Sequence, residues 1–183
     1  ATRLQPVILQ IGQAAGTMAA ICINKKIKPH QLHIRYLQSL LLKEKVYLMP
    51  YLDVDKKDPA FESIQRIGAS GILRGKGIPY KWANQTWFYP DSTITRKDFQ
   101  AGIKSWEQNF NLWSENDLQP TSYADVIDVI NTISMLFIKK SDFRPDSNWS
   151  SSKILSRKEI AILLDKSIDP FDLKSIDWDG NIK

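Results

Sequence analysis

The sequence has little of what disulfide-bonded, metal-binding and membrane-spanning proteins use. Its single cysteine, Cys22, excludes an internal disulfide. Its two histidines, His30 and His33, are spaced to give two metal ligands from a helix, but no third ligand is apparent, so we predict that they face solvent or cap a helix. The longest apolar stretch, residues 7–23, contains two glutamines and a threonine, so we predict no membrane span.

The sequence also lacks a large cluster of charges of one sign. The net charge is +5, but lysines and arginines are interleaved with acids, whereas nucleic-acid binding needs a basic stripe on one face. Two groups of acids, around Asp53 and around Asp177, lack the glycine and distal glutamate of a calcium loop and are predicted to form turns. A catalytic pair of carboxylates remains an alternative, because the two members of such a pair come together in space and need not be close along the chain.

An internal repeat occupies most of the chain. Residues 58–113 and 121–168 each predict a helix, a loop and a second helix, and two copies imply one fold unit used twice. The matched positions are Ile64, Ile67, Ile72, Phe88, Pro90 and Asp91 in the first copy, and Ile130, Ile133, Ile138, Phe143, Pro145 and Asp146 in the second.

The second helix of each copy has a recognisable start. Thr95 with Asp98, and Ser156 with Glu159, have the spacing of a capping box, in which a hydroxyl and a carboxylate satisfy early backbone N–H groups. Asp58 followed by proline predicts the start of the first helix. Apolar residues follow both caps at helical spacing, so both helices are predicted to bury one face.

These repeats resemble the S-layer homology module, a helical unit that holds cell-wall polysaccharide in many bacterial surface proteins. The resemblance implies that Arg96 and Arg157 contact the polysaccharide, and it is compatible with a periplasmic or cell-surface location that the sequence alone does not fix. An exposed subset of the aromatic residues, Trp82 and Trp87 among them, would stack on sugars. The alternatives are that the arginines pair with acids or helix ends and that the aromatic residues fill the core.

The first 50 residues predict two helices. The first spans residues 7–23, is almost entirely apolar or small, and is expected to pack on several sides, with Gly12 and Gly16 on one face. Another backbone or a flat ligand could approach that face closely. A short loop and a second helix over residues 34–41 follow.

Residues 1–50 resemble the last conserved segment of a family of FAD-dependent oxidoreductases, some of which are labelled xanthan lyases. The resemblance places a helix N-terminus beneath the flavin, where backbone N–H groups and the helix dipole favour negative charge. The residues it implies at the FAD are Arg3, Gly12, Gln13, Ala14, Ala15 and Gly16.

The nucleotide-binding part of such an oxidoreductase is not in this sequence. No Gly-x-Gly-x-x-Gly fingerprint follows a strand, and the glycines at 71, 75 and 77 have the wrong spacing. We therefore expect that the missing N-terminal nucleotide-binding region of the same protein is the partner of this chain. Without it the chain should retain no FAD and should be inactive by itself.

The sequence thus predicts a mainly α-helical protein with little β structure. A flavoprotein segment, residues 1–50, precedes a two-repeat domain, residues 51–183, with an extended connector at 47–54 and a short hairpin within 75–87. Three functions remain as alternatives: a C-terminal part of an FAD-dependent oxidoreductase, a polysaccharide-binding module or part of a xanthan lyase-like protein, and a structural brace or dimer contact.

Overall fold

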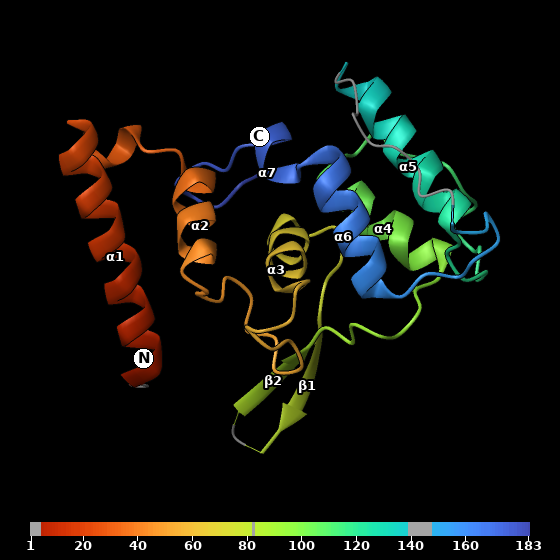
Figure 1. Cartoon of the computed structure of the whole chain (residues 1–183), viewed down its shortest axis with the longest axis horizontal. Helices are drawn as coiled ribbons and strands as arrows, with labels where there is room; N and C mark the ends of the chain where they lie inside the picture. Colours follow the sequence, from red (N-terminus) through yellow and green to blue (C-terminus); the bar gives the residue numbers. More distant parts are fainter. Residues whose placement is uncertain (1–4, 82, 139–147) are drawn as a thin grey trace. The chain divides into compact units, whose positions relative to one another are not determined.

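The structure is a computed structural model that describes residues 5–81, 83–138 and 148–183 (Figure 1). Its elements are α1 (Gln5–Lys25), the 3-10 helix η1 (Pro29–Gln31), α2 (Ile34–Lys43), α3 (Phe61–Ser70), β1 (Lys76–Tyr80), β2 (Ala83–Trp87), α4 (Arg96–Trp106), α5 (Tyr123–Leu136), α6 (Arg157–Ile168) and α7 (Pro170–Leu173). The predicted mainly α-helical fold is confirmed. None of the described helices is long and apolar enough to cross a membrane.

The described chain forms two compact units. Of the described residues, the first unit contains 5–48 together with the tail, residues 174–183, and the second contains 49–81, 83–138 and 148–173. The tail is held in the first unit by hydrogen bonds from Arg35 Nε to the Lys174 carbonyl and from Trp178 Nε1 to the His30 carbonyl. The sequence pattern had grouped these last residues with the repeats.

In the first unit, α1 packs along one side only. The apolar residues of this contact are Ile21, Cys22, Leu32, Leu37, Leu41 and Val46. Large apolar residues of α1 remain exposed: Ile8, Leu9, Ile11 and Ile23 are 52–76% exposed. Leu9 and Ile23 lie on the side away from the contact, whereas Ile11 lies on the stripe of Met18 and Cys22, before the contact begins. The expectation that this helix packs on several sides is therefore wrong for the described chain, because the residues of its own unit cover a single face.

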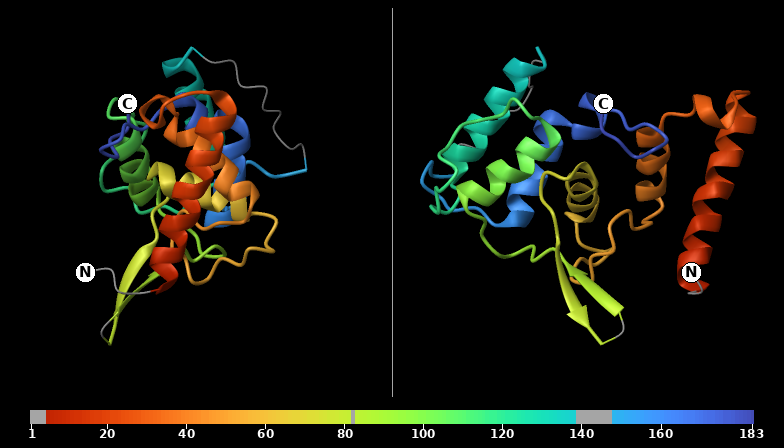
Figure 2. Two further views of the ribbon diagram at one scale, coloured as in Figure 1. Left: turned by 90° about the vertical axis from the view of Figure 1, so that its left-hand side faces the viewer. Right: turned by 180° about the vertical axis from the view of Figure 1, so that it is seen from behind.

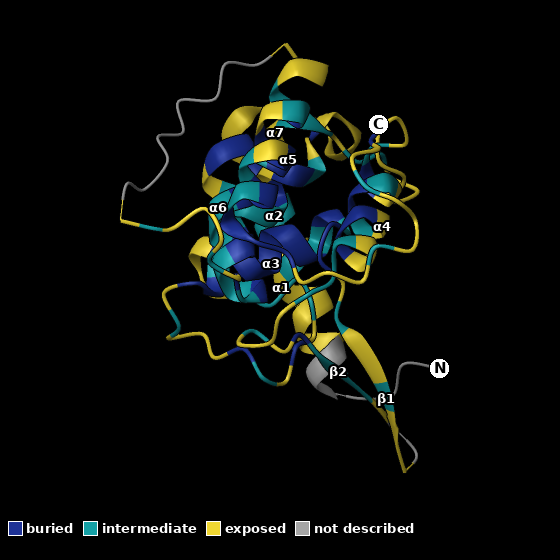
Figure 3. Cartoon of the chain, turned by 90° about the vertical axis from the view of Figure 1, so that its right-hand side faces the viewer, coloured by how far each residue is buried: buried dark blue, intermediate teal, exposed yellow. Residues whose placement is uncertain are grey.

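The core of the second unit lies between α3, α4, α5 and α6, whose inward faces are buried (Figure 3). Ile64, Ile67, Ile130, Ile133 and Leu164 are all at most 1% exposed. Most of the isoleucine skeleton of the repeat is thus in the core of this unit, but Ile138, which was matched to the buried Ile72, is 95% exposed. The matched positions Phe143, Pro145 and Asp146 lie outside the described residues.

Helix α3 begins later than the sequence predicted. The Asp58 carboxylate accepts a 2.7 Å hydrogen bond from the Ala60 N–H, which forms a turn, and the helix starts at Phe61. Further along α3, Arg66 forms ion pairs with Asp165, near the end of α6, and with Asp169, which follows that helix. These ion pairs therefore help to hold α3 against the end of α6.

The predicted caps of α4 and α6 are confirmed. Thr95 Oγ1 accepts from the Asp98 N–H, and Ser156 and Glu159 form a full capping box. A third box, Ser122 with Asp125, starts α5.

The three capped helix starts pair with one another in a closed ring. Isolated antiparallel bridges join Thr93 to Ser156, Thr95 to Pro120, and Ser122 to Ile154. The first two N–H groups of each helix donate to carbonyls of a neighbouring loop, at residues 90–92 for α6, 117–119 for α4 and 151–153 for α5. These N–H groups, which a helix leaves unsatisfied, are thereby paired.

The predicted hairpin within 75–87 is confirmed. Strands β1 and β2 pair antiparallel, with Lys76 opposite Trp87 and Tyr80 opposite Ala83. The hairpin projects from the helices of its unit (Figure 2). The connector reaches it through a bridge between Tyr51 and Thr86, which ties the start of the second unit to β2.

Candidate functional site

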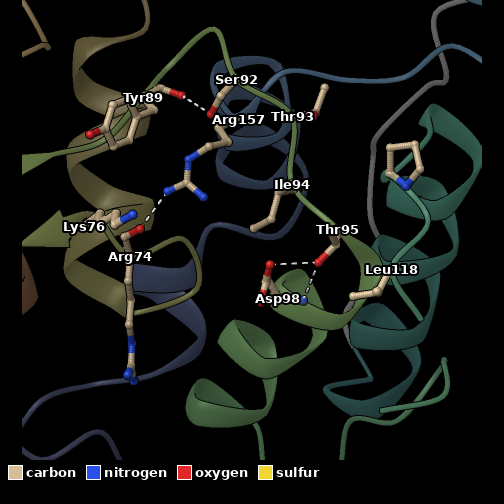
Figure 4. Close-up of a pocket in the computed structure, with 11 residues that line it drawn as sticks. Arg74, Lys76, Tyr89, Ser92, Thr93, Ile94, Thr95, Asp98, Leu118 and Arg157 are labelled. Atoms are coloured by element: carbon tan, nitrogen blue, oxygen red, sulfur yellow. Dashed lines mark hydrogen bonds between the residues drawn. The ribbon is translucent and has the colours of Figure 1, made fainter. Parts of the chain in front are cut away.

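A pocket of about 430 Å³ lies in the second unit beside the starts of α4 and α6 (Figure 4). It is lined by Arg74, Lys76, Tyr89, Ser92, Thr93, Ile94, Thr95, Asp98, Leu118, Pro120 and Arg157. A smaller hollow of about 230 Å³ shares Arg74, Ile94, Asp98 and Arg157 with it. The pocket therefore combines the turn before α4, the strand β1 and the first residue of α6.

Arg157 is the buried cation of this pocket. It is 9% exposed, its Nε donates to the Phe88 carbonyl at 2.7 Å, and a terminal nitrogen donates to the Arg74 carbonyl at 2.7 Å. Burial lowers the pKa of its guanidinium. Within the described part of the chain it forms no ion pair with a carboxylate. Its guanidinium carbon lies 4.7 Å from the centre of the Phe88 ring, and the charges of Asp53 and Asp98 act on it from nearby.

The remaining charges of the pocket are also mostly positive. Arg74 and Lys76 are exposed and line the pocket with Arg157. Asp98 is the one acid among the lining residues, and its carboxylate already accepts from the Thr95 hydroxyl at 2.8 Å. The pocket lining thus combines three cations and several hydroxyls with one carboxylate that already accepts a hydrogen bond.

Arg96, the counterpart of Arg157 in the first repeat, has a different environment. Its guanidinium lies 2.9 Å from Asp125 and 3.4 Å from Asp117. The hydrogen bond to Asp125 and the one to Asp117 raise the pKa of Arg96. Of the two arginines that the S-layer resemblance singled out, this one is neutralised by acids, as the alternative interpretation expected.

The aromatic residues divide between core and surface. Phe88 and Trp106 are at most 2% exposed, as the core interpretation expected. Trp87 is half-buried, and its ring stacks on Tyr89 with centroids 6.1 Å apart. Trp82 lies outside the described residues.

Sequence reasoning missed three residues that build this pocket: Arg74, Lys76 and Asp53. Tyr89 belongs to the aromatic residues of which an exposed subset was expected to stack on sugars. Asp53 was predicted to form a turn, but its carboxylate accepts the N–H groups of Phe88 and Tyr89 at 2.8 and 2.6 Å. Nothing in the local sequence pairs residues 35 positions apart. The one signal in the sequence that could have indicated the pocket was the pair of cations around the start of the hairpin, Arg74 and Lys76.

The second candidate is the open face of α1. A Cβ added to Gly12 or Gly16 would meet no atom within 4 Å, and Gln13 and Ala15 are exposed. Ala14 instead packs against the apolar cluster of its unit. Arg3 lies outside the described residues.

The position of the glycines within α1 differs from the expectation. The helix already begins at Gln5, so Gly12 lies about two turns inside it. Its N–H belongs to the internal hydrogen-bond ladder, and the dipole argument for a helix start does not apply to it. What these residues offer is a flat, open surface.

His30 and His33 are exposed, as predicted, and His33 occupies the N-cap position of α2. Within the described ranges, no group of three or more His, Cys, Asp and Glu side chains is arranged to hold a metal ion. The Asp177 carboxylate accepts the N–H groups of Asp179 and Asn181 and so forms a turn.

Comparison with known proteins bears on one end of the chain. Residues 1–41 match the family model described as FAD dependent oxidoreductase, a range that includes α1, η1 and most of α2. No curated protein and no solved structure matches the chain. The first 41 residues are therefore similar to a region of FAD-dependent oxidoreductases.

Proposed function

We propose that this chain is the C-terminal part of an FAD-dependent oxidoreductase and that the open face of α1 lies against the flavin. The observation that carries the proposal is the position of Gly12 and Gly16. They stand on the uncovered side of an apolar helix, inside the segment that matches the oxidoreductase family.

The residues present fit such a ligand. Without side chains at Gly12 and Gly16, a planar ring can approach the helix backbone, and Ile8 and Ile23 extend the same apolar surface along the helix. FAD, when bound, would supply hydride transfer. The residues of this chain would position the flavin and keep water from it, while the dinucleotide part would be held by the nucleotide-binding region.

The test measures flavin content in a polypeptide that joins this chain to its nucleotide-binding region. Gly12→Leu and Gly16→Leu place bulk on the open face, so we expect flavin absorbance per protein to fall at least tenfold, about 1.4 kcal/mol of binding free energy. Asn24→Leu, which places the same side chain at an exposed polar position of α1, should retain the flavin.

Equal flavin content in all three variants would overturn the proposal. It would instead leave the open face as a packing surface, which is the structural-brace alternative. The chain alone, residues 1–183, should take up no FAD.

A second candidate function rests on the pocket of the second unit. We propose that it binds an acidic polysaccharide, with a sugar carboxylate accepting hydrogen bonds from Arg157. A buried guanidinium without a carboxylate partner is costly, and an anionic ligand would offset that cost. The N–H groups that start α4 and α6 are already taken by loop carbonyls, so side chains must supply the donors.

The experiment compares retention of the full chain on immobilised xanthan, which carries carboxylates, and on neutral dextran. Retention should occur on xanthan alone and should fall with added salt, because the contact is ionic. Lys76→Gln, at an exposed pocket cation, should weaken it, and Arg157→Lys, which loses the planar fork, should abolish it.

Arg96→Lys is the matched control, because Arg96 is already paired with Asp117 and Asp125. It should leave retention unchanged. Equal losses in the Arg96 and Arg157 variants, with both proteins folded by circular dichroism, would contradict the assignment to this pocket.

A further inference from the structure

A single peptide segment, Phe88–Tyr89, is fixed at all of its backbone polar groups. Asp53 accepts both N–H groups, Arg157 donates to the Phe88 carbonyl, and the Ser92 N–H and hydroxyl donate to the Tyr89 carbonyl at 3.1 and 2.9 Å. The contact between Ser92 and Tyr89 is drawn in Figure 4.

Tyr89 has a backbone conformation that aromatic residues rarely adopt. Its φ is +56°, in the left-handed region, which is an outlier for a bulky side chain. Such a conformation costs of the order of 1–3 kcal/mol and persists where the surroundings enforce it. Here the Asp53 carboxylate accepts the N–H groups of both Phe88 and Tyr89, so it is placed to hold this conformation.

The strained backbone conformation places the exposed Tyr89 ring at the pocket. Phe88 turns into the core and is fully buried, whereas Tyr89 is 39% exposed, lines the pocket and stacks on Trp87. A tyrosine with only a packing role would be expected to point into the core. Because the same segment anchors Arg157, the ring and the guanidinium are fixed relative to one another.

We propose that Tyr89 is a stacking platform for the sugar ring whose carboxylate Arg157 binds, and that Asp53 is its positioning residue. This inference rests on the second proposed function and adds a selectivity to it. The pocket would prefer a carboxylate carried on a pyranose ring to a bare carboxylate, because aromatic faces pack on the C–H face of sugars. Pre-organisation by Asp53 would reduce the entropy lost on binding.

The test measures three probes by NMR titration of the full chain: trigalacturonate, which has rings and carboxylates, acetate, which has a carboxylate without a ring, and maltotriose, which has rings without charge. Tyr89→Asn removes the ring but tolerates a positive φ. We expect it to bind trigalacturonate about tenfold more weakly and acetate with unchanged affinity. Tyr89→Phe, which keeps the ring, should bind like the original chain.

The positioning role of Asp53 has a separate readout. Asp53→Asn should weaken trigalacturonate binding as Tyr89→Asn does, and the double variant should lose no more than either single one, because both remove the same contact. Acetate affinity should again be unchanged.

The outcomes separate the two proposals. If Arg157→Lys abolishes trigalacturonate binding while Tyr89→Asn leaves it intact, the stacking platform is overturned and the carboxylate site stands. If the original chain binds neither acidic probe, the polysaccharide function is overturned, and the platform with it. Tyr89→Asn weakening both acidic probes equally would show a fold defect and contradict the platform.

Discussion

The Nε atom of Arg157 donates a 2.7 Å hydrogen bond to the carbonyl oxygen of Phe88, which lies 69 residues earlier in the chain. The bond joins the first residue of α6, in the second repeat, to the turn of the first. A second bond, to the Arg74 carbonyl, joins the same side chain to the segment before β1. Arg157 therefore organises the pocket as well as lining it.

The two arginines of the repeats should differ in what they contribute to stability. Arg157→Met leaves two carbonyls without their donor, so we expect a loss of about 2–4 kcal/mol in the free energy of unfolding. Arg96→Met removes partly exposed ion pairs and should cost about 1 kcal/mol. Urea unfolding followed by tryptophan fluorescence measures both, and equal losses would contradict the structural role of Arg157.

Glu159 makes stability depend on acid. Burial raises the pKa of its carboxyl, but the Lys153 ammonium and the Ser156 N–H and hydroxyl outweigh burial, so the pKa lies below the usual 4.5. A group with a lowered folded-state pKa stabilises the fold above its unfolded pKa, and this contribution is lost as the pH falls through the folded pKa.

We therefore expect Glu159→Gln to melt at a lower temperature than the original chain at pH 7, with the gap closing below about pH 4.5. Glu115→Gln, at a side chain 84% exposed, is the control and should change little. A gap that stays constant down to pH 3 would show that the charge of Glu159 does not contribute.

Gly102 tests the packing of α4. An added Cβ would overlap the backbone carbonyl oxygen of Ile72. Alanine favours a helix over glycine by about 1 kcal/mol, yet we expect Gly102→Ala to destabilise the protein by about 1–3 kcal/mol, because backbone cannot move aside cheaply. Gly77→Ala, where a Cβ meets nothing within 4 Å, is the matched control for thermal unfolding. A more stable Gly102→Ala would contradict the close contact.

Local signals in the sequence predicted the local structure well. The caps at Thr95 and Ser156 and the hairpin depend on residues a few positions apart, and the structure has all three. The helix start at Asp58 was placed too early, because a carboxylate that forms a turn and one that caps a helix leave the same sequence pattern.

The pocket and the surroundings of α1 depend on distant parts of the chain. Asp53 and Tyr89 are brought together by the bridge between the connector and β2, which no periodicity reveals. The apolarity of α1 correctly indicated a helix, but apolarity alone does not say which neighbour covers it. In the described chain, no residue covers the side of α1 that carries Gly12 and Gly16.

The central claim, that the open face of α1 lies against bound FAD, is tested most directly by hydroxyl-radical footprinting of the joined polypeptide with and without flavin. We predict that Ile8, Leu9 and Ile23 become several-fold less reactive when FAD is bound, while the exposed Leu52 of the second unit keeps its reactivity. Equal reactivity of these three α1 residues in the two forms would contradict the claim.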